Sequence, residues 1–326
     1  MSLEIVEYGS YLGVEGHEFV IKTNNIVTRR VLFHEARRAV ISSGNNISST
    51  ALYWLAQYGV ETMIASKSNK VVSVLVPVEA DMRANTRMMQ YEAYHNQKGI
   101  KIANAFVRSK IRSEINFFEN HDLQGIGRLE KIICKLDIRG KNIDEVRNRI
   151  QVVEAQASRI YLKEYFKQFP DELNPNKRYK YGARDPLNNL LNLGYEVIKR
   201  EIILAMVPMH LDPYLGFLHS YFRFKQSLVY DLIEPFRVVV EEFVLSYHGR
   251  LTENSFENVG KRVYLKKDEE IQFVKAMNKT LKIRVDYQRY GKPVKARIST
   301  IIKEEPIKLA QYIRNKHPKY QSHIMG

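Results

Sequence analysis

The chain has 326 residues, 44% of them hydrophobic, which is enough for one large or two ordinary folded domains. Its formal net charge of +15 indicates a polyanionic partner and favours nucleic acid over a membrane surface. The one cysteine, Cys134, excludes an intrachain disulfide and a cysteine metal cage, so a reducing compartment is expected. Cys134 lies in LEKIICKL, where we expect a small buried side chain.

The charge is uneven along the chain. Residues 1–75 carry a net charge of +1 and residues 76–260 carry +3, whereas the 17 basic and 6 acidic residues of 261–326 give +11. The N-terminus, MSLEIVEYGS, lacks the basic and apolar regions of a secretion signal. No apolar run approaches the roughly 18 residues of a membrane span. We expect a cytoplasmic protein that contacts nucleic acid through its C-terminal quarter.

From about residue 3 to residue 78, short runs of Val, Ile, Tyr and Phe alternate with turn residues, as in EIVEYGSYLGVEG and HEFVIKTNN. This pattern predicts a small antiparallel β domain. One helix interrupts it, SSTALYWLAQYG, which starts after a serine N-cap and ends at Gly59. Two more strands are expected in VETMIAS and KVVSVLVPV.

After Pro77 the apolar residues recur with the 3.6-residue period of helices, for example in IKIANAFVRSKIRSEINFFENH. We place a boundary near residues 78–84, which gives a β domain at 1–80 and an all-helical domain at 81–326. The second domain ends in a basic tail from about residue 261. Its last dozen residues, NKHPKYQSHIMG, are expected to be poorly ordered. The fold class is therefore α+β.

One predicted helix begins at the N-cap Asn142, with Glu145 in the capping-box position, and continues through DEVRNRIQVVEAQASRIYLKEYF. Its apolar stripe comprises Val146, Ile150, Val153, Ala157, Ile160 and Tyr161. Glu154 projects from this stripe rather than from the solvated face. Because a buried carboxylate must be paired, protonated or bound to a cation, Glu154 forms either a salt bridge to a neighbouring arginine or part of a cation site.

The segment GFLHSYFRFKQSLVYDLIEPFR is largely apolar, yet it contains His219, Asp231 and Glu234. On one unbroken helix His219 and Glu234 would lie roughly 22 Å apart, so they can meet only if the chain turns between them. We expect a short turn or helix at His219 and a second helix from Gln226 or Ser227. That helix would place Asp231 and Glu234 one turn apart on one face. Individually, a core histidine and a solvated acidic pair remain alternatives.

Together these side chains form a set of mostly oxygen ligands with one imidazole, which suits Mn²⁺ or Mg²⁺ and argues against a structural zinc site. In a basic chain, the anion that such a metal faces is expected to be a phosphodiester. A divalent cation there would offset charge on the non-bridging oxygens and lower the pKa of an attacking hydroxyl or water.

Three motifs in this order, VEAQASRIY, DPYLGFLHS and YDLIEPFR, resemble those of the CRISPR-associated protein one family, the integrase and nuclease subunit of spacer acquisition. The segments GARDPLNNLLNLGYEVI and GIKIANAFVRSKI are also similar to that family, so the resemblance covers roughly the whole chain.

The resemblance implies that Glu154, His219 and Glu234 are metal ligands and that Asp231 is a catalytic residue beside them. At the position of Glu234 the family often has Asp. Arg237 is expected either to hold a phosphate with two hydrogen bonds or to be a plain surface arginine. Further candidate DNA contacts are Tyr195, Asn188, Asn189 and Arg184. For Tyr195 a core role, and for the two asparagines a role in ordering their helix, are alternatives.

The family also implies a homodimer joined through the N-terminal β domains, and a small bridging partner, CRISPR-associated protein two. The implied reaction is attack by the 3′-hydroxyl of a DNA fragment on a phosphodiester at the edge of a repeat, or cleavage of double-stranded, branched or 3′-ended DNA by water. The alternative class is a non-enzymatic architectural nucleic-acid-binding protein. In that case the acidic residues and the histidine are structural and the basic tail binds nucleic acid.

Overall fold

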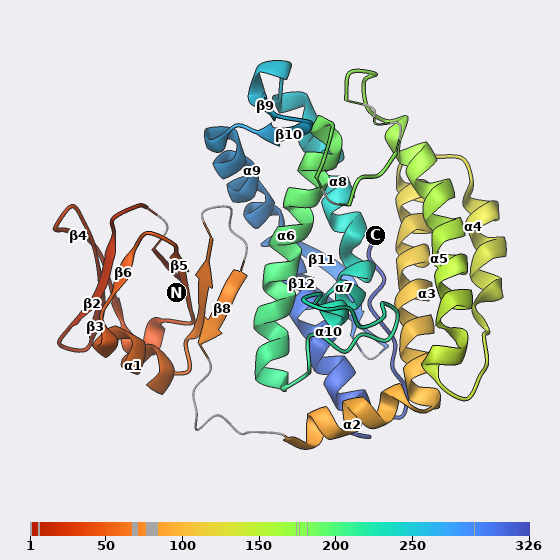
Figure 1. Ribbon diagram of the computed structural model, residues 1–326, viewed down its shortest axis with the longest axis horizontal. Coiled ribbons are helices and arrows are strands. Elements are labelled where there is room, and N and C mark those ends of the chain that lie inside the picture. Colours follow the sequence, from red (N-terminus) through yellow and green to blue (C-terminus); the bar gives the residue numbers. More distant parts are fainter. Residues whose placement is uncertain are drawn as a thin grey trace. The chain divides into compact units, whose positions relative to one another are not determined.

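The computed structural model describes residues 2–5, 7–66, 71–75, 84–173, 175, 177–180, 182–289 and 291–326. The chain forms two compact units, Met1–Arg83 and Ala84–Gly326 (Figure 1). The boundary expected near residues 78–84 falls almost entirely outside the described residues.

The first unit contains two four-stranded sheets. One has the order β1-β5-β7-β8 and the other the order β4-β3-β2-β6. The strands are β1 (Ser2–Ile5), β2 (Tyr11–Glu15), β3 (Glu18–Thr23), β4 (Ile26–Leu32), β5 (Arg38–Ser42), β6 (Asn46–Ile47), β7 (Glu61–Ala65) and β8 (Val71–Leu75). The last two are the strands predicted in VETMIAS and KVVSVLVPV.

The expectation of a purely antiparallel domain is wrong in detail. Strands β2, β3 and β4 pair antiparallel, as do β7 and β8. Strand β5, however, pairs parallel with both β1 and β7, and β2 pairs parallel with β6. A parallel pair needs a crossover connection, and the predicted helix α1 (Ser49–Gln57) lies between β5 and β7 in the chain. Its N-cap is Ser48, whose side chain accepts from the backbone N–H of Ala51, as expected.

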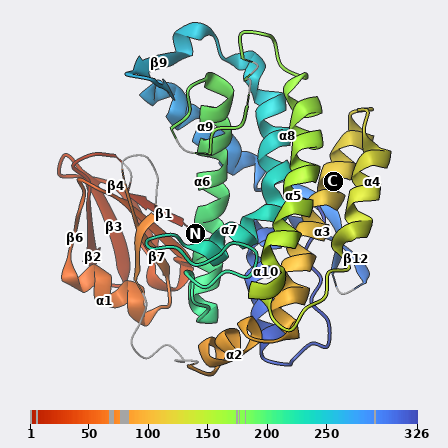
Figure 2. The same cartoon turned by 45° about the vertical axis from the view of Figure 1, so that its right-hand side comes forward.

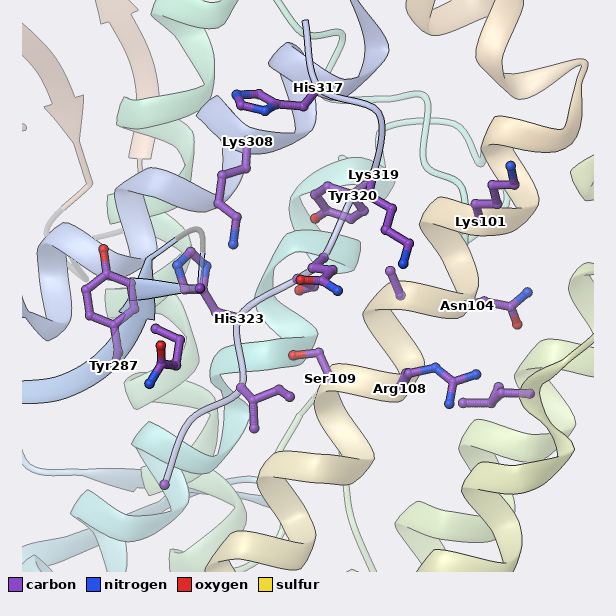
Figure 3. A pocket seen from close by; sticks show the side chains of 18 of the residues that line it. Lys101, Asn104, Arg108, Ser109, Tyr287, Lys308, His317, Lys319, Tyr320 and His323 are labelled. Carbon is purple, nitrogen blue, oxygen red and sulfur yellow. The ribbon is translucent and has the colours of Figure 1, made fainter. Parts of the chain in front are cut away.

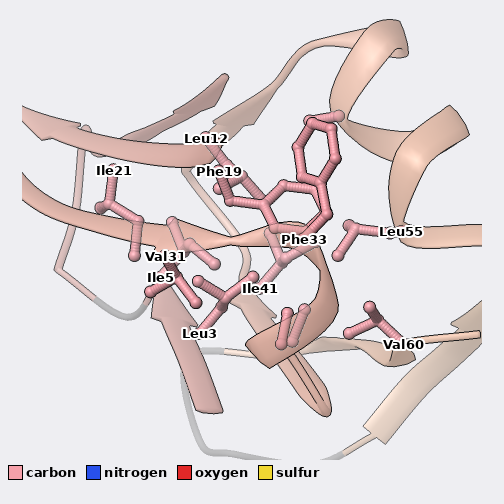
Figure 4. Packing of buried hydrophobic residues seen from close by; sticks show 13 residues of the cluster. Leu3, Ile5, Leu12, Phe19, Ile21, Val31, Phe33, Ile41, Leu55 and Val60 are labelled. Atoms are coloured by element: carbon pink, nitrogen blue, oxygen red, sulfur yellow. The ribbon is translucent and has the colours of Figure 1, made fainter. Parts of the chain in front are cut away.

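The core of this unit lies between the strands and α1 (Figure 4). Alternate strand residues such as Leu3 and Ile5 on β1 point into it. The ring of Phe33 is fully buried and stacks on Trp54 of α1 with centroids 5.1 Å apart. The alternation of apolar residues in the sequence is therefore the pattern that closes the core.

The second unit is mainly helical. Its helices are α2 (Ala84–Tyr94), α3 (Gln97–Asn120), α4 (Ile126–Ile133), α5 (Ile143–Phe166), α6 (Pro186–Met206), α7 (Ser227–Ile233), α8 (Arg237–Tyr247), α9 (Lys267–Thr280) and α10 (Ile298–Ile313). The 3-10 turn η4 (Glu234–Phe236) joins α7 to α8. Helices α3, α4 and α5 lie side by side in two views (Figures 1 and 2).

Helix α6 packs against α7, α8, α9 and α10. It begins at Pro186 with Asp185 as the N-cap. Gly194 permits its close approach to α8, because a Cβ there would lie 2.3 Å from a methyl group of Val240. This packing fixes the position of the α7–η4–α8 segment, which carries the predicted site residues Asp231, Glu234 and Arg237.

The second unit is not all-helical, and the basic C-terminal quarter is not a tail. Residues from 261 onward belong to β10, α9, α10 and the hairpin of β11 (Arg284–Arg289) and β12 (Lys292–Arg297). Strand β10 (Arg262–Leu265) pairs with β9 (Phe256–Val259). None of the described helices is long and apolar enough to cross a membrane.

The last dozen residues, which we call the C-terminal segment (315–326), are ordered, contrary to expectation. Tyr320, His323 and Met325 are buried. The backbone N–H of Met325 donates to Ser113 of α3 at 2.8 Å, and that of His323 donates to Glu305 of α10 at 3.1 Å. These contacts order a segment whose polar composition had suggested disorder. The expectation for Cys134 is also wrong, because its side chain is exposed.

Candidate active site

Two predicted ligands meet on the ammonium group of Lys110. Glu154 comes from the middle of α5, Glu234 from η4 and Lys110 from α3. The Nζ atom of Lys110 lies 2.9 Å from Oε2 of Glu234, and it also contacts Oε1 of Glu154. Carboxylates 80 positions apart in the sequence therefore converge on one cationic nitrogen. The salt bridge considered for Glu154 is present, with a lysine in place of an arginine.

Lys110 was missed from the sequence, although a signal for it existed. It lies four positions after Phe106 and one before Ile111, on the apolar stripe that buries α3. The same reasoning that drew attention to Glu154 applies here, because a buried ammonium also needs partners. Glu114, one turn further along α3, is buried as well and is another residue that this reasoning could have found.

The electrostatic balance keeps both carboxylates ionised. Burial alone would raise the pKa of Glu234, but the charges of Arg237 and Lys110 outweigh burial and hold that pKa well below its usual range. Burial also opposes ionisation of Glu154, and Lys110 again lowers its pKa. Burial would lower the pKa of Lys110, but Glu154 and Glu234 raise it above its ordinary value. The cluster is thus a set of mutually compensating charges.

His219 is placed by Asp231. The chain turns between residues 211 and 226, and α7 then begins at Ser227 as predicted. Asp231 is fully buried, and its carboxylate accepts from the backbone N–H groups of Phe217, Leu218 and His219 at 2.6–2.9 Å. It also accepts from Nδ1 of His219 at 2.7 Å. Asp231 therefore fixes both the turn and the imidazole, and both of its carboxylate oxygens accept hydrogen bonds from them.

Gly216 makes this turn possible. A Cβ at this position would lie 2.7 Å from the carbonyl oxygen of His219 and 2.9 Å from Oδ2 of Asp231. Both distances are shorter than side-chain carbons tolerate, so another residue would push the turn away from the carboxylate. Gly216, the glycine in DPYLGFLHS, thus permits the tight turn that orients His219.

Arg237 pairs with Glu234 through two hydrogen bonds, each 2.8 Å long. The expectation of a plain surface arginine is wrong, because the side chain is only 16% exposed. Its guanidinium also lies over the ring of Tyr195, 4.8 Å from the centroid. The hydroxyl of Tyr195 donates to Glu241 at 2.6 Å. Burial and Glu241 raise the pKa of Tyr195, so the phenol stays protonated.

The asparagines of α6 order the local structure. Asn188 is fully buried and receives hydrogen bonds from Arg178 and the backbone N–H of Tyr179. Asn189 is also buried, and it accepts from the backbone N–H of Leu265. Of the two roles left open for these residues, the structure supports ordering of the helix. Arg184 is exposed and lies over the ring of Tyr179, 5.5 Å from its centroid.

A strongly basic cavity of about 290 Å³ opens beside the cluster of Lys110, Glu154 and Glu234. His219, Tyr195 and Arg237 contribute to its wall. Its other cationic residues are Arg178, Lys180, Lys199 and Lys225. An anion entering this cavity would meet the imidazole of His219 and the guanidinium of Arg237 together. The positive charge of its lining therefore suits the cavity to an anion.

The donor set fits a hard divalent cation in chemical terms. Two ionised carboxylates already converge on one positive charge, and Asp231 engages Nδ1 of His219, which leaves Nε2 as the nitrogen for a ligand. Within the described part of the chain, no three His, Cys, Asp or Glu side chains are already close enough to hold a metal. The ammonium of Lys110 lies between the two carboxylates, where a divalent metal ion would bind.

Comparisons with known proteins show which family the sequence matches. The sequence model of the family described as CRISPR associated protein Cas1 matches residues 3–279. The CRISPR-associated endonuclease Cas1 of Korarchaeum cryptofilum is 29% identical over 249 residues, covering 71% of this chain and 73% of its own. The CRISPR-associated endonuclease Cas1 3 of Thermus thermophilus is 27% identical over 325 residues, covering 97% and 95%.

Solved structures share the fold. A casposase bound to integration product superimposes with a TM-score of 0.79 at 25% identity, covering 98% of this chain and 92% of its own. A Cas6-RT-Cas1–Cas2 complex gives a TM-score of 0.75 at 16% identity over 99% of this chain and 36% of that chain. The family match spans most of the sequence, and it includes the three motifs that supply Glu154, His219 and Glu234. The chain belongs to the CRISPR-associated protein Cas1 family.

Proposed function

We propose that this Cas1 chain cuts and joins DNA at a site formed by Glu154, Glu234 and His219. As a Cas1 protein it is a nuclease and integrase of CRISPR adaptation. In the joining reaction the 3′-hydroxyl of a DNA fragment attacks a phosphodiester of a repeat, and the 3′-oxygen of the broken strand leaves. In cleavage, water takes the place of the attacking hydroxyl.

The observation that carries this proposal is the shared contact of Glu154 and Glu234 with Lys110. It supports a site where two ionised carboxylates can bind one cation. A bound Mn²⁺ or Mg²⁺ would offset charge on the phosphodiester and acidify the attacking hydroxyl. Glu154, Glu234 and Nε2 of His219 are the groups that would hold it.

The chain's own residues perform the remaining tasks. The basic cavity beside His219 receives the phosphodiester and brings it to the carboxylates. Asp231 keeps the imidazole in one orientation, with Nδ1 as the hydrogen-bond donor. Arg237 keeps Glu234 in place through two hydrogen bonds and contributes positive charge to the cavity wall. These groups are fixed before substrate arrives, which lowers the cost of reaching the reactive geometry.

The proposal includes partners. The β unit is expected to join two copies of the chain, and a small protein of the Cas2 type is expected to bridge two such dimers. The assembly named in the Cas6-RT-Cas1–Cas2 structure is consistent with that partner. We place the protein in the cytoplasm, where its DNA substrate lies.

The test is to measure cleavage and strand joining, together with DNA affinity, for the wild type and for Glu154→Gln. Glu242→Gln serves as the control, because Glu242 is also a helical glutamate but is 51% exposed. We expect Glu154→Gln to abolish cleavage and joining and to weaken Mn²⁺ binding, measured by electron paramagnetic resonance, while DNA affinity holds. An architectural DNA-binding protein would give neither metal-dependent reaction in the wild type nor a difference between these two variants.

A further inference from the structure

Aromatic rings in the second unit differ in how far they are already packed. A cavity of about 870 Å³ is lined by α3, the β11–β12 hairpin, α10 and the C-terminal segment (Figure 3). Two tyrosines of its lining are packed within the protein, since Tyr320 contacts Phe106 and Tyr287 contacts His323 ring to ring. Those rings are therefore not open to a ligand. Exposed rings lie instead on the segment that follows His219.

This segment, residues 220–226, which we call the aromatic turn, carries three exposed aromatic side chains. Tyr221 is 65% exposed, Phe222 is 68% exposed and Phe224 is 84% exposed. Single apolar residues scattered over a surface need no explanation. Three within four positions, however, form a small apolar patch, and such a patch indicates a contact with another molecule.

The aromatic turn leaves the wall of the basic cavity and returns to it. His219, just before the turn, and Lys225, near its end, both line that cavity. Arg223 and Lys225 make the turn basic, and the sequence between Asp212 and Asp231 contains no acidic residue. An anionic strand with one phosphate in the cavity would therefore extend past the exposed rings.

Hydrogen bonds hold the aromatic turn in one conformation. The backbone N–H of Lys225 donates to the carbonyl of Phe222 at 3.0 Å and closes a four-residue turn. Ser227, which is fully buried at the start of α7, holds both ends of the segment. Its hydroxyl donates to the carbonyl of Ser220 at 2.8 Å, and its backbone N–H donates to that of Lys225 at 2.9 Å. The exposed rings are thus positioned in advance, which lowers the entropy cost of binding.

Phe224 has a backbone conformation that favours glycine, with a φ of +63°. A turn with positive φ at its third residue ordinarily has glycine or asparagine there. The other described non-glycine residues with positive φ are of types that tolerate this region, namely Asn24, Asn25, Asp122, His210 and Asn315. The ring of Phe224 gains almost no burial in return for its strained backbone, because it is 84% exposed. The fold therefore does not account for a phenylalanine here, and strain of this kind is typical of functional positions.

We propose that Phe224 stacks on an unpaired base next to the phosphodiester in the basic cavity, so that the site prefers DNA with an open base pair there over intact duplex. Tyr221 and Phe222 extend the apolar surface beside it. The guanidinium of Arg223 lies 4.9 Å from the centroid of the Phe224 ring and adds positive charge for a neighbouring phosphate. Aromatic rings stack on any base, so this preference follows base pairing and not sequence. The inference rests on the proposed function and adds the residue that selects among forms of its DNA substrate.

The experiment compares a DNA fork with an intact duplex of the same sequence, each with 2-aminopurine at the first position that is unpaired in the fork. Cleavage of both by the full-length protein in Mn²⁺ gives the ratio of kcat/KM for fork over duplex. The fluorescence of 2-aminopurine is measured separately in EDTA, because stacking on an aromatic ring quenches it. The variants are Phe224→Gly, which removes the ring and the backbone strain, and Phe224→Trp, which keeps a ring. Tyr53→Ala is the matched control, since Tyr53 is a 56% exposed aromatic residue of the first unit.

The wild type should prefer the fork, and Phe224→Gly should lower the kcat/KM ratio about tenfold and abolish the quenching. Its melting temperature should stay the same or rise, because glycine accepts the positive φ. Phe224→Trp and Tyr53→Ala should keep the ratio within about twofold of the wild type.

The inference is overturned if Phe224→Gly keeps the preference and the quenching, or if it loses them only together with a lower melting temperature. A change of oligomeric state in light scattering with an unchanged preference would make the aromatic turn a protein contact, and would overturn it too. Failure of the proposed function looks different. The wild type then cuts neither DNA in Mn²⁺, whereas the fluorescence in EDTA still shows whether Phe224 stacks on the open base.

Discussion

Asp231 and His219 are joined twice. One oxygen of Asp231 accepts from Nδ1 of the His219 ring at 2.7 Å and from the backbone N–H of His219 at 2.9 Å. The other oxygen accepts from the two preceding backbone N–H groups. Because a carboxylate can only accept, this contact fixes Nδ1 as the donor and leaves Nε2 available to a ligand. Asp231, which the motif YDLIEPFR placed beside the site, thus positions the ring of His219.

The first prediction concerns Asp231→Asn. An amide NH₂ would face N–H groups that need acceptors, and a buried unsatisfied donor costs about 1–3 kcal/mol. We expect a lower melting temperature and a loss of cleavage that comes from a misplaced His219. Thermal unfolding and cleavage of a 3′-ended DNA, measured on the same preparation, check this.

The matched control is Asp137→Asn, since the side chain of Asp137 is 78% exposed and should tolerate the same change. If Asp231→Asn keeps full stability and full activity, the carboxylate does not position His219. A variant that is folded at the assay temperature but inactive would support the positioning role most directly.

The second prediction concerns the stability of the fold at low pH. Glu305 is fully buried, and His323 and Tyr320 donate to it. Burial would raise the pKa of this carboxyl, but the charge of His323 and these hydrogen bonds lower it from 4.5 to about 2. A carboxyl whose pKa is lower in the folded state stabilises the fold above pH 4.5, and this contribution is lost as the pH falls toward 2. The lowering corresponds to about 3 kcal/mol.

Urea unfolding of the wild type and of Glu305→Gln at several pH values between 7 and 3 measures this contribution. We expect the stability difference to be largest near neutral pH and to shrink on acidification. Glu304→Gln, which alters the neighbouring and less buried carboxylate, provides the comparison. A difference that does not change with pH would show that Glu305 supports the C-terminal segment only through its shape.

The sequence predicted the elements better than their pairing. The N-cap of α5 at Asn142, the start of α7 at Ser227 and the helix α1 all follow from local capping and periodicity, and the structure confirms them. The parallel pairing of β5 with β1 and β7 depends on which distant strands meet, and strand periodicity carries no such information. Local rules therefore identified these helices, but they missed strands β9 to β12 and failed for topology.

The candidate active site shows the same contrast between what the local sequence predicts and what depends on distant contacts. A carboxylate on an apolar stripe drew attention to Glu154, and a histidine in an apolar segment drew attention to His219. What each one contacts could not be predicted from spacing, because Lys110 reaches both carboxylates from a third helix. The order of the C-terminal segment was likewise hidden, since its buried contact with Glu305 is made across the fold. Polar composition alone could not distinguish such a segment from a disordered one.

The third prediction concerns the charge of the C-terminal quarter. Replacing the exposed residues Lys282, Arg284, Lys292 and Lys295 of the β11–β12 region by glutamine should weaken DNA binding. It should also flatten the salt dependence, because each lost phosphate contact removes about 0.9 from the slope of log K against log salt. Fluorescence anisotropy at a series of salt concentrations measures both quantities.

Glutamine at Lys131 and Lys135, exposed on or just after α4, serves as the control for a general loss of charge. The hairpin is a DNA contact if its variants lose more slope per charge than the α4 variants do. Equal slopes per charge in the two sets would mean that the basic hairpin contributes only to the overall field.

The last prediction concerns Glu154→Ala alone and together with Lys110→Met. Lys110 keeps its 2.9 Å contact with Glu234 when Glu154 is removed, so the single change should cost only about 1–2 kcal/mol of stability. Lys110→Met should cost more, about 3–5 kcal/mol, because it leaves Glu154 without its ammonium in a mostly buried site. Mn²⁺ should recover part of that loss by binding between the carboxylates.

The double variant removes both charges and should therefore be more stable than Lys110→Met alone, which is the signature of a direct interaction. Glu154→Ala should stay folded, lose cleavage and joining, and lose the stabilisation by Mn²⁺ in thermal unfolding. A Glu154→Ala protein that still cuts DNA in Mn²⁺ would exclude this carboxylate from the reaction. If instead the protein unfolds early and Mn²⁺ stabilises it as much as the wild type, Glu154 serves only the salt bridge with Lys110, and the cation site must be built from other groups.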